Sequence, residues 1–243
     1  MELEARVALV TGAGRRVGRA IAEGLGARRM RVAVHYHGAA DGATDAVRAI
    51  RAAGGEAEAF AADLADGAAP PRRVDAVVER FGGLDVLVNS AAIMERTPFG
   101  EVAPAQWDRI VAINLRAPFL LAQAAAPHLA RAAGAVVNIA DLAAYETWPG
   151  FIPHGITKAG VVKLTESLAR VMAPRVRVNA VAPGTVLLPD DWEPAAAEHL
   201  RATTPLDRPG SPADVVQAVL YLLAADYVTG ETIVVDGGRR IRR

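Results

Sequence analysis

The chain has 243 residues, of which 52% are hydrophobic and 22% charged, and its 27 basic residues balance its 27 acidic ones. This length and composition fit one globular domain, residues 1–243, and exclude a disordered chain. The balanced charge gives no basic field for nucleic acid, and the absence of cysteine excludes disulfides, thiolate metal sites and thiol catalysis. The N-terminus lacks a signal-like apolar core, and no apolar run is long and uninterrupted enough to cross a bilayer. We therefore expect a cytoplasmic protein with no metal, membrane or nucleic-acid partner.

An apolar run near the N-terminus leads into a glycine-rich turn and then into a run with helical character, at residues 7–22. We expect a buried strand, a tight turn and the start of a helix. Gly12, Gly14 and Gly18 lie where the backbone must turn sharply and let a pyrophosphate approach. Because the start of a helix presents unpaired N–H groups and the positive end of its dipole, this segment is predicted to bind phosphate.

Strand-like and helical segments alternate along the rest of the chain. Strands are predicted at residues 31–36, 56–61, 84–88, 135–139 and 176–181 and within 229–236. Helices are predicted at residues 41–53, 71–81, 104–131 (with breaks near Pro118 and Pro127), 153–171 and 212–224, the last opened by a capping box from Ser211 to Asp214. This alternation indicates an α/β fold with a doubly wound parallel sheet of about seven strands. Residues 187–210 are polar, proline-punctuated and only briefly helical, which predicts a lid over the substrate.

The end of the second predicted strand decides which cofactor fits. An NAD-binding enzyme usually carries Asp or Glu there to hold the ribose 2′-hydroxyl, whereas this chain has His35, Tyr36 and His37. Arg15 and Arg16 are close by in the glycine-rich turn. An acid would repel a 2′-phosphate, while imidazole and guanidinium groups donate hydrogen bonds to it, so these residues favour NADP(H).

The glycine-rich turn resembles the Thr-Gly-x-x-x-Gly-x-Gly turn of the short-chain dehydrogenase/reductase family, which has a Rossmann-type fold. Arg16 stands where the family has its middle glycine. An arginine there resembles the pteridine reductase branch, as does the His-Tyr-His run, and the resemblance implies that Arg16 reaches the cofactor phosphates and the substrate. The turn residues that it assigns to the cofactor are Gly12, Gly14, Arg15, Arg16, Val17 and Gly18.

Later stretches carry the same resemblance over nearly the whole chain. It implies that Asp63, with Leu64 beside it, accepts a hydrogen bond from the adenine amino group. For a stretch that resembles the Asn-Asn-Ala-Gly motif, the resemblance implies that its backbone lies against the adenosine ribose and that its first residue ties neighbouring strands together. A Pro-Gly-Thr stretch resembles the motif that borders the nicotinamide. The residues so assigned are Asn89, Ser90 and Ala91 for the first stretch and Pro183, Gly184 and Thr185 for the second.

The candidate catalytic residues follow the fifth predicted strand. The family places a serine past this strand, a tyrosine about thirteen residues later and a lysine four residues after that; here those positions hold Asp141, His154 and Lys158. Residues four apart on a helix share one face, so His154 and Lys158 are predicted to point together into the cleft. Lys158 is one of only two lysines in a chain that otherwise uses arginine. Asn114 matches the family's helix asparagine, which supports a water chain to the lysine.

Histidine in place of tyrosine is the main departure from the family. Imidazole is the commonest general acid or base, so His154 can supply the proton. Three alternatives remain: Asp141 carries the proton while His154 orients, Tyr145 swings in from the intervening loop, or the catalytic site has been lost.

These residues lead to three functional hypotheses. The first is an NADPH-dependent reductase of a pterin-like C=N bond or of a carbonyl group, with Arg16, Met94, Asp141 and Trp192 as substrate residues. The second is a reductase of acyl or sugar ketones, since Met94 stands where the pterin branch has a stacking aromatic residue. The third is a non-catalytic NADP(H)-binding sensor. The family usually forms tetramers, which the apolar faces around residues 115–129 and 161–168 suit, so we expect a homotetramer.

Overall fold

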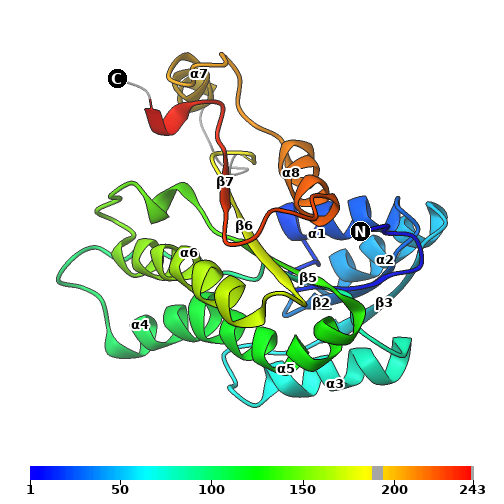
Figure 1. Cartoon of the computed structure of the whole chain (residues 1–243). Helices are drawn as coiled ribbons and strands as arrows, with labels where there is room; N and C mark the ends of the chain where they lie inside the picture. Colours follow the sequence, from blue (N-terminus) through cyan, green and yellow to red (C-terminus); the bar gives the residue numbers. More distant parts are fainter. Residues whose placement is uncertain (188–193, 242–243) are drawn as a thin grey trace.

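The computed structural model describes residues 1–187 and 194–241 of the chain. Within them one sheet has seven strands in the order β3-β2-β1-β4-β5-β6-β7, and all neighbouring strands run parallel (Figure 1). The strands are β1 (Val7–Val10), β2 (Arg31–Tyr36), β3 (Glu56–Ala61), β4 (Val86–Asn89), β5 (Ala135–Ile139), β6 (Arg177–Pro183) and β7 (Thr232–Val235). The predicted doubly wound parallel sheet is confirmed.

The strand order reverses at β1. The chain first builds outward through β2 and β3, then returns to place β4 on the other side of β1 and continues outward to β7. In open α/β sheets, ligands bind outside the carboxyl ends of the strands at such a switch point. The carboxyl ends of β1 and β4 therefore mark the expected crevice.

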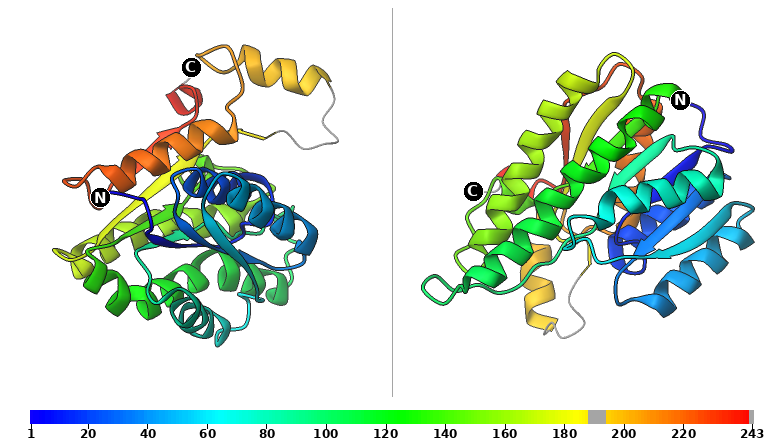
Figure 2. Two further views of the ribbon diagram at one scale, coloured as in Figure 1. Left: turned by 90° about the vertical axis from the view of Figure 1, so that its right-hand side faces the viewer. Right: turned by 90° about the horizontal axis from the view of Figure 1, so that it is seen from below.

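Helices cover both faces of the sheet (Figure 2). The core on one face is formed with α1 (Arg16–Gly26), α2 (Ala40–Ala52) and α8 (Pro212–Ala224). The core on the other face is formed with α3 (Ala69–Phe81), α5 (Ala117–Ala132) and α6 (Ile152–Met172). Because both faces are covered, the central strands β1, β4 and β5 are buried at every residue, and apart from Asn89 and Asn138 they are apolar throughout rather than alternating.

The segment from Pro104 to Ala132 differs from its prediction. It forms one continuous helical run of α4 (Pro104–Val111), a π-helical turn η1 (Ala112–Arg116) and α5. Pro118 does not break it, because this residue falls in the first turn of α5, and Pro127 lies inside that helix. By length and composition this run could cross a membrane, contrary to the expectation, but 50% of its apolar window is buried in the fold, as in a core helix of a globular protein.

The predicted lid contains a helix of its own. Residues Pro194–Ala202 form α7, so the described part of this segment is more helical than its polar, proline-punctuated sequence suggests. Two short helical turns, η2 (Leu142–Ala144) and η3 (Arg239–Ile241), follow β5 and β7. Trp192, a predicted substrate residue, lies outside the described residues.

Candidate active site

The turn between β1 and α1 has the features of an anion site. No side chain caps the first turn of α1, and this turn contains no acidic residue. Gly12 has φ +67°, and a Cβ there would lie 2.8 Å from the Cα of Ala91, while a Cβ on Gly18 would lie 2.3 Å from the Gly12 carbonyl oxygen. Only glycine fits these positions, and the free amides of the helix start fit a pyrophosphate. Arg16 has φ +51°, a conformation that favours the glycine found there in the resembled turn.

Polar side chains connect this turn to β4 and β5. The Thr11 hydroxyl accepts hydrogen bonds from the amides of Ser90 (2.9 Å) and Ala91 (3.0 Å). The Asn89 amide donates to Asn138 Oδ1 at 2.9 Å across neighbouring strands, which confirms the predicted tie between them. Asn89 Oδ1 is buried and has no partner among the described residues, so a donor from a bound molecule fits there.

His35 is placed differently from its prediction as a phosphate contact. It is 2% exposed, its Nδ1 accepts from the Gly12 amide at 3.1 Å, and its Nε2 lies 3.2 Å from the Ala62 carbonyl oxygen. Burial lowers the pKa of His35 from 6.5 to about 4, so the ring is neutral. His35 thus holds the glycine turn through its contact with the Gly12 amide. Tyr36 is half-buried and His37 is exposed.

The rim of the sheet where the adenine was predicted is formed at Asp63 by the loop that follows β3. Asp63 Oδ1 accepts from the Ala65 amide at 2.9 Å, and Leu64 is 4% exposed. Asp63 also lines a pocket of 180 Å³ with Ala61, Ala62, Asp66, Ala69, Arg72 and Arg73. The rim is therefore fixed by local hydrogen bonds before any ligand arrives.

Asp141, His154 and Lys158 meet at the carboxyl end of β5. Asp141 Oδ1 accepts from the Ala143 amide at 2.9 Å, and its Oδ2 lies 3.7 Å from His154 Nε2. His154 and Lys158 are both buried on α6, one helical turn apart. Lys158 Nζ donates to the Ile139 carbonyl at 2.8 Å; burial lowers the pKa of Lys158 and the charge of Asp141 opposes that shift.

Asn114 joins this cluster from the π-helical turn. Its Oδ1 accepts from the Ile93 amide at 2.8 Å, and its Nδ2 lies 2.9 Å from the Ile93 carbonyl oxygen and 3.4 Å from His154 Nδ1. The same Nδ2 donates to Thr157 Oγ1 at 3.2 Å. A π-turn inside an α-helix is frequent at functional sites. Ile93 and Thr157 were not predicted from the sequence; the only signal was the place of Thr157 between His154 and Lys158.

The remaining predicted residues border this edge of the sheet. Met94 is 50% exposed, Pro183 is buried, and Gly184 and Thr185 are half-buried. Arg16 donates to the Leu187 carbonyl at 3.2 Å and so connects the glycine turn to the first residue of the predicted lid.

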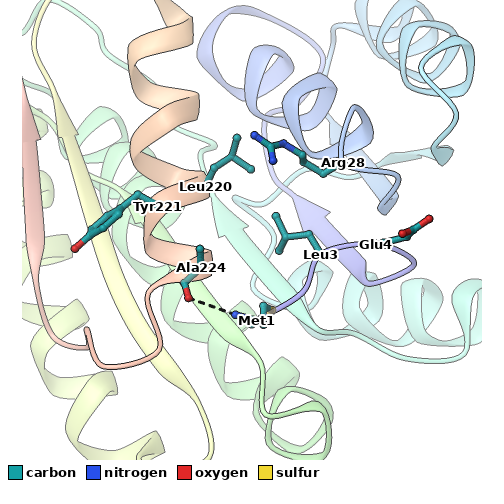
Figure 3. A pocket seen from close by; sticks show the side chains of 7 residues that line it. All are labelled: Met1, Leu3, Glu4, Arg28, Leu220, Tyr221 and Ala224. Carbon is teal, nitrogen blue, oxygen red and sulfur yellow. Dashed lines mark hydrogen bonds between the residues drawn. The ribbon is translucent and has the colours of Figure 1, made fainter.

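Two other features lie apart from the cluster. Tyr145, 40% exposed, packs under the Arg240 guanidinium, 4.3 Å from the ring centroid. A pocket of 480 Å³ is lined by the segment before β1 and by the ends of α1 and α8, at the opposite edge of the sheet (Figure 3). Its lining residues are Met1, Leu3, Glu4, Arg28, Leu220, Tyr221 and Ala224, none of which belongs to the catalytic cluster.

Comparison with known proteins agrees with this geometry. A protein assigned as ketoacyl reductase 2 of the granaticin polyketide synthase, from Streptomyces violaceoruber, is 40% identical over 246 residues, covering 98% of this chain and 97% of that protein. The 3beta-hydroxysteroid dehydrogenase 1 of Eggerthella lenta is 36% identical over 246 residues, covering 98% of this chain and 94% of that protein.

Solved structures and family comparison give the same result. A crystal structure from Sinorhizobium meliloti 1021, of a protein assigned as a short-chain alcohol dehydrogenase, matches with a TM-score of 0.93 and 34% identity and covers 100% of both chains. The protein family described as enoyl-(acyl carrier protein) reductase matches residues 12–240. This match over nearly the whole length, with these relatives, shows that the chain belongs to the short-chain dehydrogenase/reductase family.

Proposed function

We propose that the protein is an NADP(H)-dependent oxidoreductase that interconverts a keto group and a hydroxyl group on a small molecule. The observation that carries the proposal is the cluster of Asp141, His154, Lys158 and Asn114 at the same edge of the sheet as the uncapped glycine turn. Two relatives, assigned as a ketoacyl reductase and as a hydroxysteroid dehydrogenase, support the keto or hydroxyl group as the reacting group.

The residues around the turn suit NADP(H). The amides at the start of α1 would hold the pyrophosphate, and the exposed Arg15 and His37 would donate to a 2′-phosphate, since β2 ends without an acid. Ala91 and Thr185 would lie along the ribose and the nicotinamide. When bound, the nicotinamide supplies or accepts the hydride.

The residues of the catalytic cluster would carry out the proton transfer. His154 would give a proton to the developing alkoxide, or take one from the hydroxyl, at Nε2. Asp141 would balance the imidazolium charge across the 3.7 Å separation. Lys158, a buried ammonium group, would bind the nicotinamide ribose and stabilise negative charge on the substrate oxygen. In the alternative arrangement, Asp141 carries the proton and His154 orients it.

A pterin-like C=N bond is the second candidate substrate. Arg16, exposed beside the turn, and Asp141, past β5, favour it, because both follow the pteridine reductase pattern. Against it, Met94 cannot stack on a pterin ring as specifically as an aromatic side chain. The keto group is therefore the first choice.

The test is NADPH oxidation with a panel of β-ketoacyl thioesters, cyclic ketones and a dihydropterin, alongside NADPH binding by fluorescence. We expect turnover with at least one ketone and its loss in Lys158→Ala. Turnover with the dihydropterin alone would replace the keto assignment by the pterin one. Saturable NADPH binding without turnover on the whole panel would favour the non-catalytic sensor.

A further inference from the structure

Three acceptors surround the side-chain amide of Asn114. Its Nδ2 lies 2.9 Å from the Ile93 carbonyl oxygen, 3.2 Å from Thr157 Oγ1 and 3.4 Å from His154 Nδ1. The amide has only two hydrogens to donate. Its orientation is fixed, because Asn114 Oδ1 accepts from the Ile93 amide at 2.8 Å and a flipped side chain would set two donors against each other.

The two shorter contacts use both hydrogens. Thr157 can accept from Asn114 because its own hydroxyl hydrogen goes to the His154 carbonyl at 2.7 Å. No hydrogen of Asn114 is then left for His154 Nδ1. The remaining partner of Nδ1 is the Ile93 carbonyl oxygen at 3.2 Å, which can only accept. Nδ1 must therefore carry the proton of the neutral ring.

We infer that Thr157 is a positioning residue that fixes this tautomer of His154 and so makes Nε2 the reactive atom. The inference rests on the proposed function for the reaction itself, but the tautomer follows from hydrogen bonds alone. Nε2 is buried without a hydrogen-bond partner among the described residues, and Asp141 Oδ2 at 3.7 Å is too far for a hydrogen bond. Nε2 is thus the ring nitrogen without a hydrogen-bond partner among the described residues, and a substrate oxygen would supply that partner in the reaction.

The tautomer sets the proton chemistry in each direction. With a neutral ring, the Nε2 lone pair accepts the hydroxyl proton of an alcohol while its carbon loses hydride to the oxidised cofactor. In the reverse direction the imidazolium would return that proton to the carbonyl oxygen of the substrate, whose carbon takes up a hydride. Among the described residues, the charged group facing the ring is Asp141 past β5, and Lys158, one helical turn away on α6, interacts with Asp141; the loop at Ile93 and the π-turn at Asn114 present neutral groups.

Nitrogen NMR of histidine-labelled protein, at a pH where the rings are neutral, reads the tautomer directly. The chain has 5 histidines, and the His154 signals are those lost in His154→Gln. His35 serves as an internal reference of the opposite kind, because its Nδ1 accepts from the Gly12 amide. We expect His154 to show a protonated Nδ1 and His35 a protonated Nε2. A protonated Nε2 on neutral wild-type His154 overturns the inference.

The variant Thr157→Val tests whether Thr157 fixes the tautomer of His154. Valine cannot accept, so one hydrogen of Asn114 is released and turns to Nδ1, and the proton of the ring moves to Nε2. Thr157→Ser keeps the hydroxyl and the wild-type signals. The matched control is Thr165→Val, also buried on α6, whose hydroxyl donates to the Val161 carbonyl and accepts from Asn138 instead. Wild-type His154 signals in Thr157→Val would overturn the role of Thr157.

Kinetics separate this role from a structural one. On a substrate that the panel identifies, Thr157→Val should lower kcat roughly 3- to 10-fold in both directions, the effect of one neutral hydrogen bond, with KM unchanged. Thr165→Val should keep the wild-type kcat. A rise in KM with kcat unchanged would overturn the inference. If no substrate turns over while the tautomers follow the expectation, the proposed function fails and the tautomer assignment stands.

Discussion

At the residue scale, two histidines with the same burial face opposite kinds of partner. His35 and His154 are each 2% exposed. His35 meets a backbone donor at Nδ1, whereas His154 meets a backbone acceptor there. The first ring is therefore occupied at both nitrogens and holds the glycine turn, and the second keeps one nitrogen for chemistry.

The neutral state of His35 makes stability depend on pH. Its pKa is about 4 in the folded protein against 6.5 in an exposed chain, so the unfolded chain binds a proton that the folded chain does not between these values. The free energy of unfolding should fall by about 3 kcal/mol as pH drops through this window, and be fully regained above pH 6.5. Urea unfolding at a series of pH values measures it.

His35→Asn isolates this contribution. Asparagine can still accept from the Gly12 amide but does not titrate, so the pH dependence should flatten in this variant. The control is His199→Asn on the exposed side of α7, which should keep the wild-type slope. An unchanged slope in His35→Asn would disprove the assignment.

The exposed residue His37 allows the choice between NADPH and NADH to be tested. Aspartate at this position would repel a 2′-phosphate and could accept from a ribose 2′-hydroxyl. His37→Asp should therefore weaken NADPH binding by about 10-fold or more, the effect of losing one charge-assisted hydrogen bond, and leave NADH binding equal or tighter. Fluorescence titration with both cofactors measures it. Equal losses for NADPH and NADH would contradict a 2′-phosphate contact.

At the scale of elements, the sequence predicted strands and helices better than it predicted their ends and interruptions. Short apolar segments separated by helical ones identified the sheet, and the capping box at Ser211 is present as predicted. We did not predict that the helical run of α4, η1 and α5 continues through Pro118. A helix tolerates proline in its first turn, and the sequence does not show where that turn starts. The length of α7 was underestimated, because a polar segment with prolines has no core-facing pattern.

The candidate site was also predicted only in part from the sequence. The periodicity of a helix was enough to predict that His154 and Lys158 lie together, whereas Asp141 was placed beside them by the resemblance to the family. The burial of His35 and the contacts of Asn114 with Ile93 and Thr157 depend on segments far apart in the chain. No local pattern encodes such contacts.

The capping box offers a test at this scale. The Ser211 hydroxyl donates to Asp214 Oδ2 at 2.9 Å, a contact that alanine cannot make, and Arg208 binds the same carboxylate through two contacts of 3.0 and 3.1 Å. Ser211→Ala should lower the free energy of unfolding by about 1 kcal/mol, the usual cost of losing an N-cap. Ser167→Ala, at an exposed position inside α6, should cost less. Equal effects in urea unfolding would mean that the cap contributes nothing specific.

At the scale of the whole molecule, the expected homotetramer needs an apolar surface on α5 and α6. Phe119 on α5 is 43% exposed, and a charge there would be buried in such an interface. Light scattering should give about four times the chain mass of 25.4 kDa for the wild type, and a smaller mass for Phe119→Glu. Tyr227→Glu, at a residue 100% exposed, is the matched control and should keep the wild-type mass. A wild-type monomer would refute the tetramer.

The strand order also has a consequence for synthesis on the ribosome. β1 pairs with β2 soon after both emerge, but its other neighbour, β4, begins only at Val86. Until then the nascent chain carries a bare, fully apolar strand edge, the kind of edge that pairs wrongly with other chains. The same β1–β4 closure brings Ser90 and Ala91 to Thr11. A cofactor therefore cannot protect the segment that is made before Val86 while it leaves the ribosome.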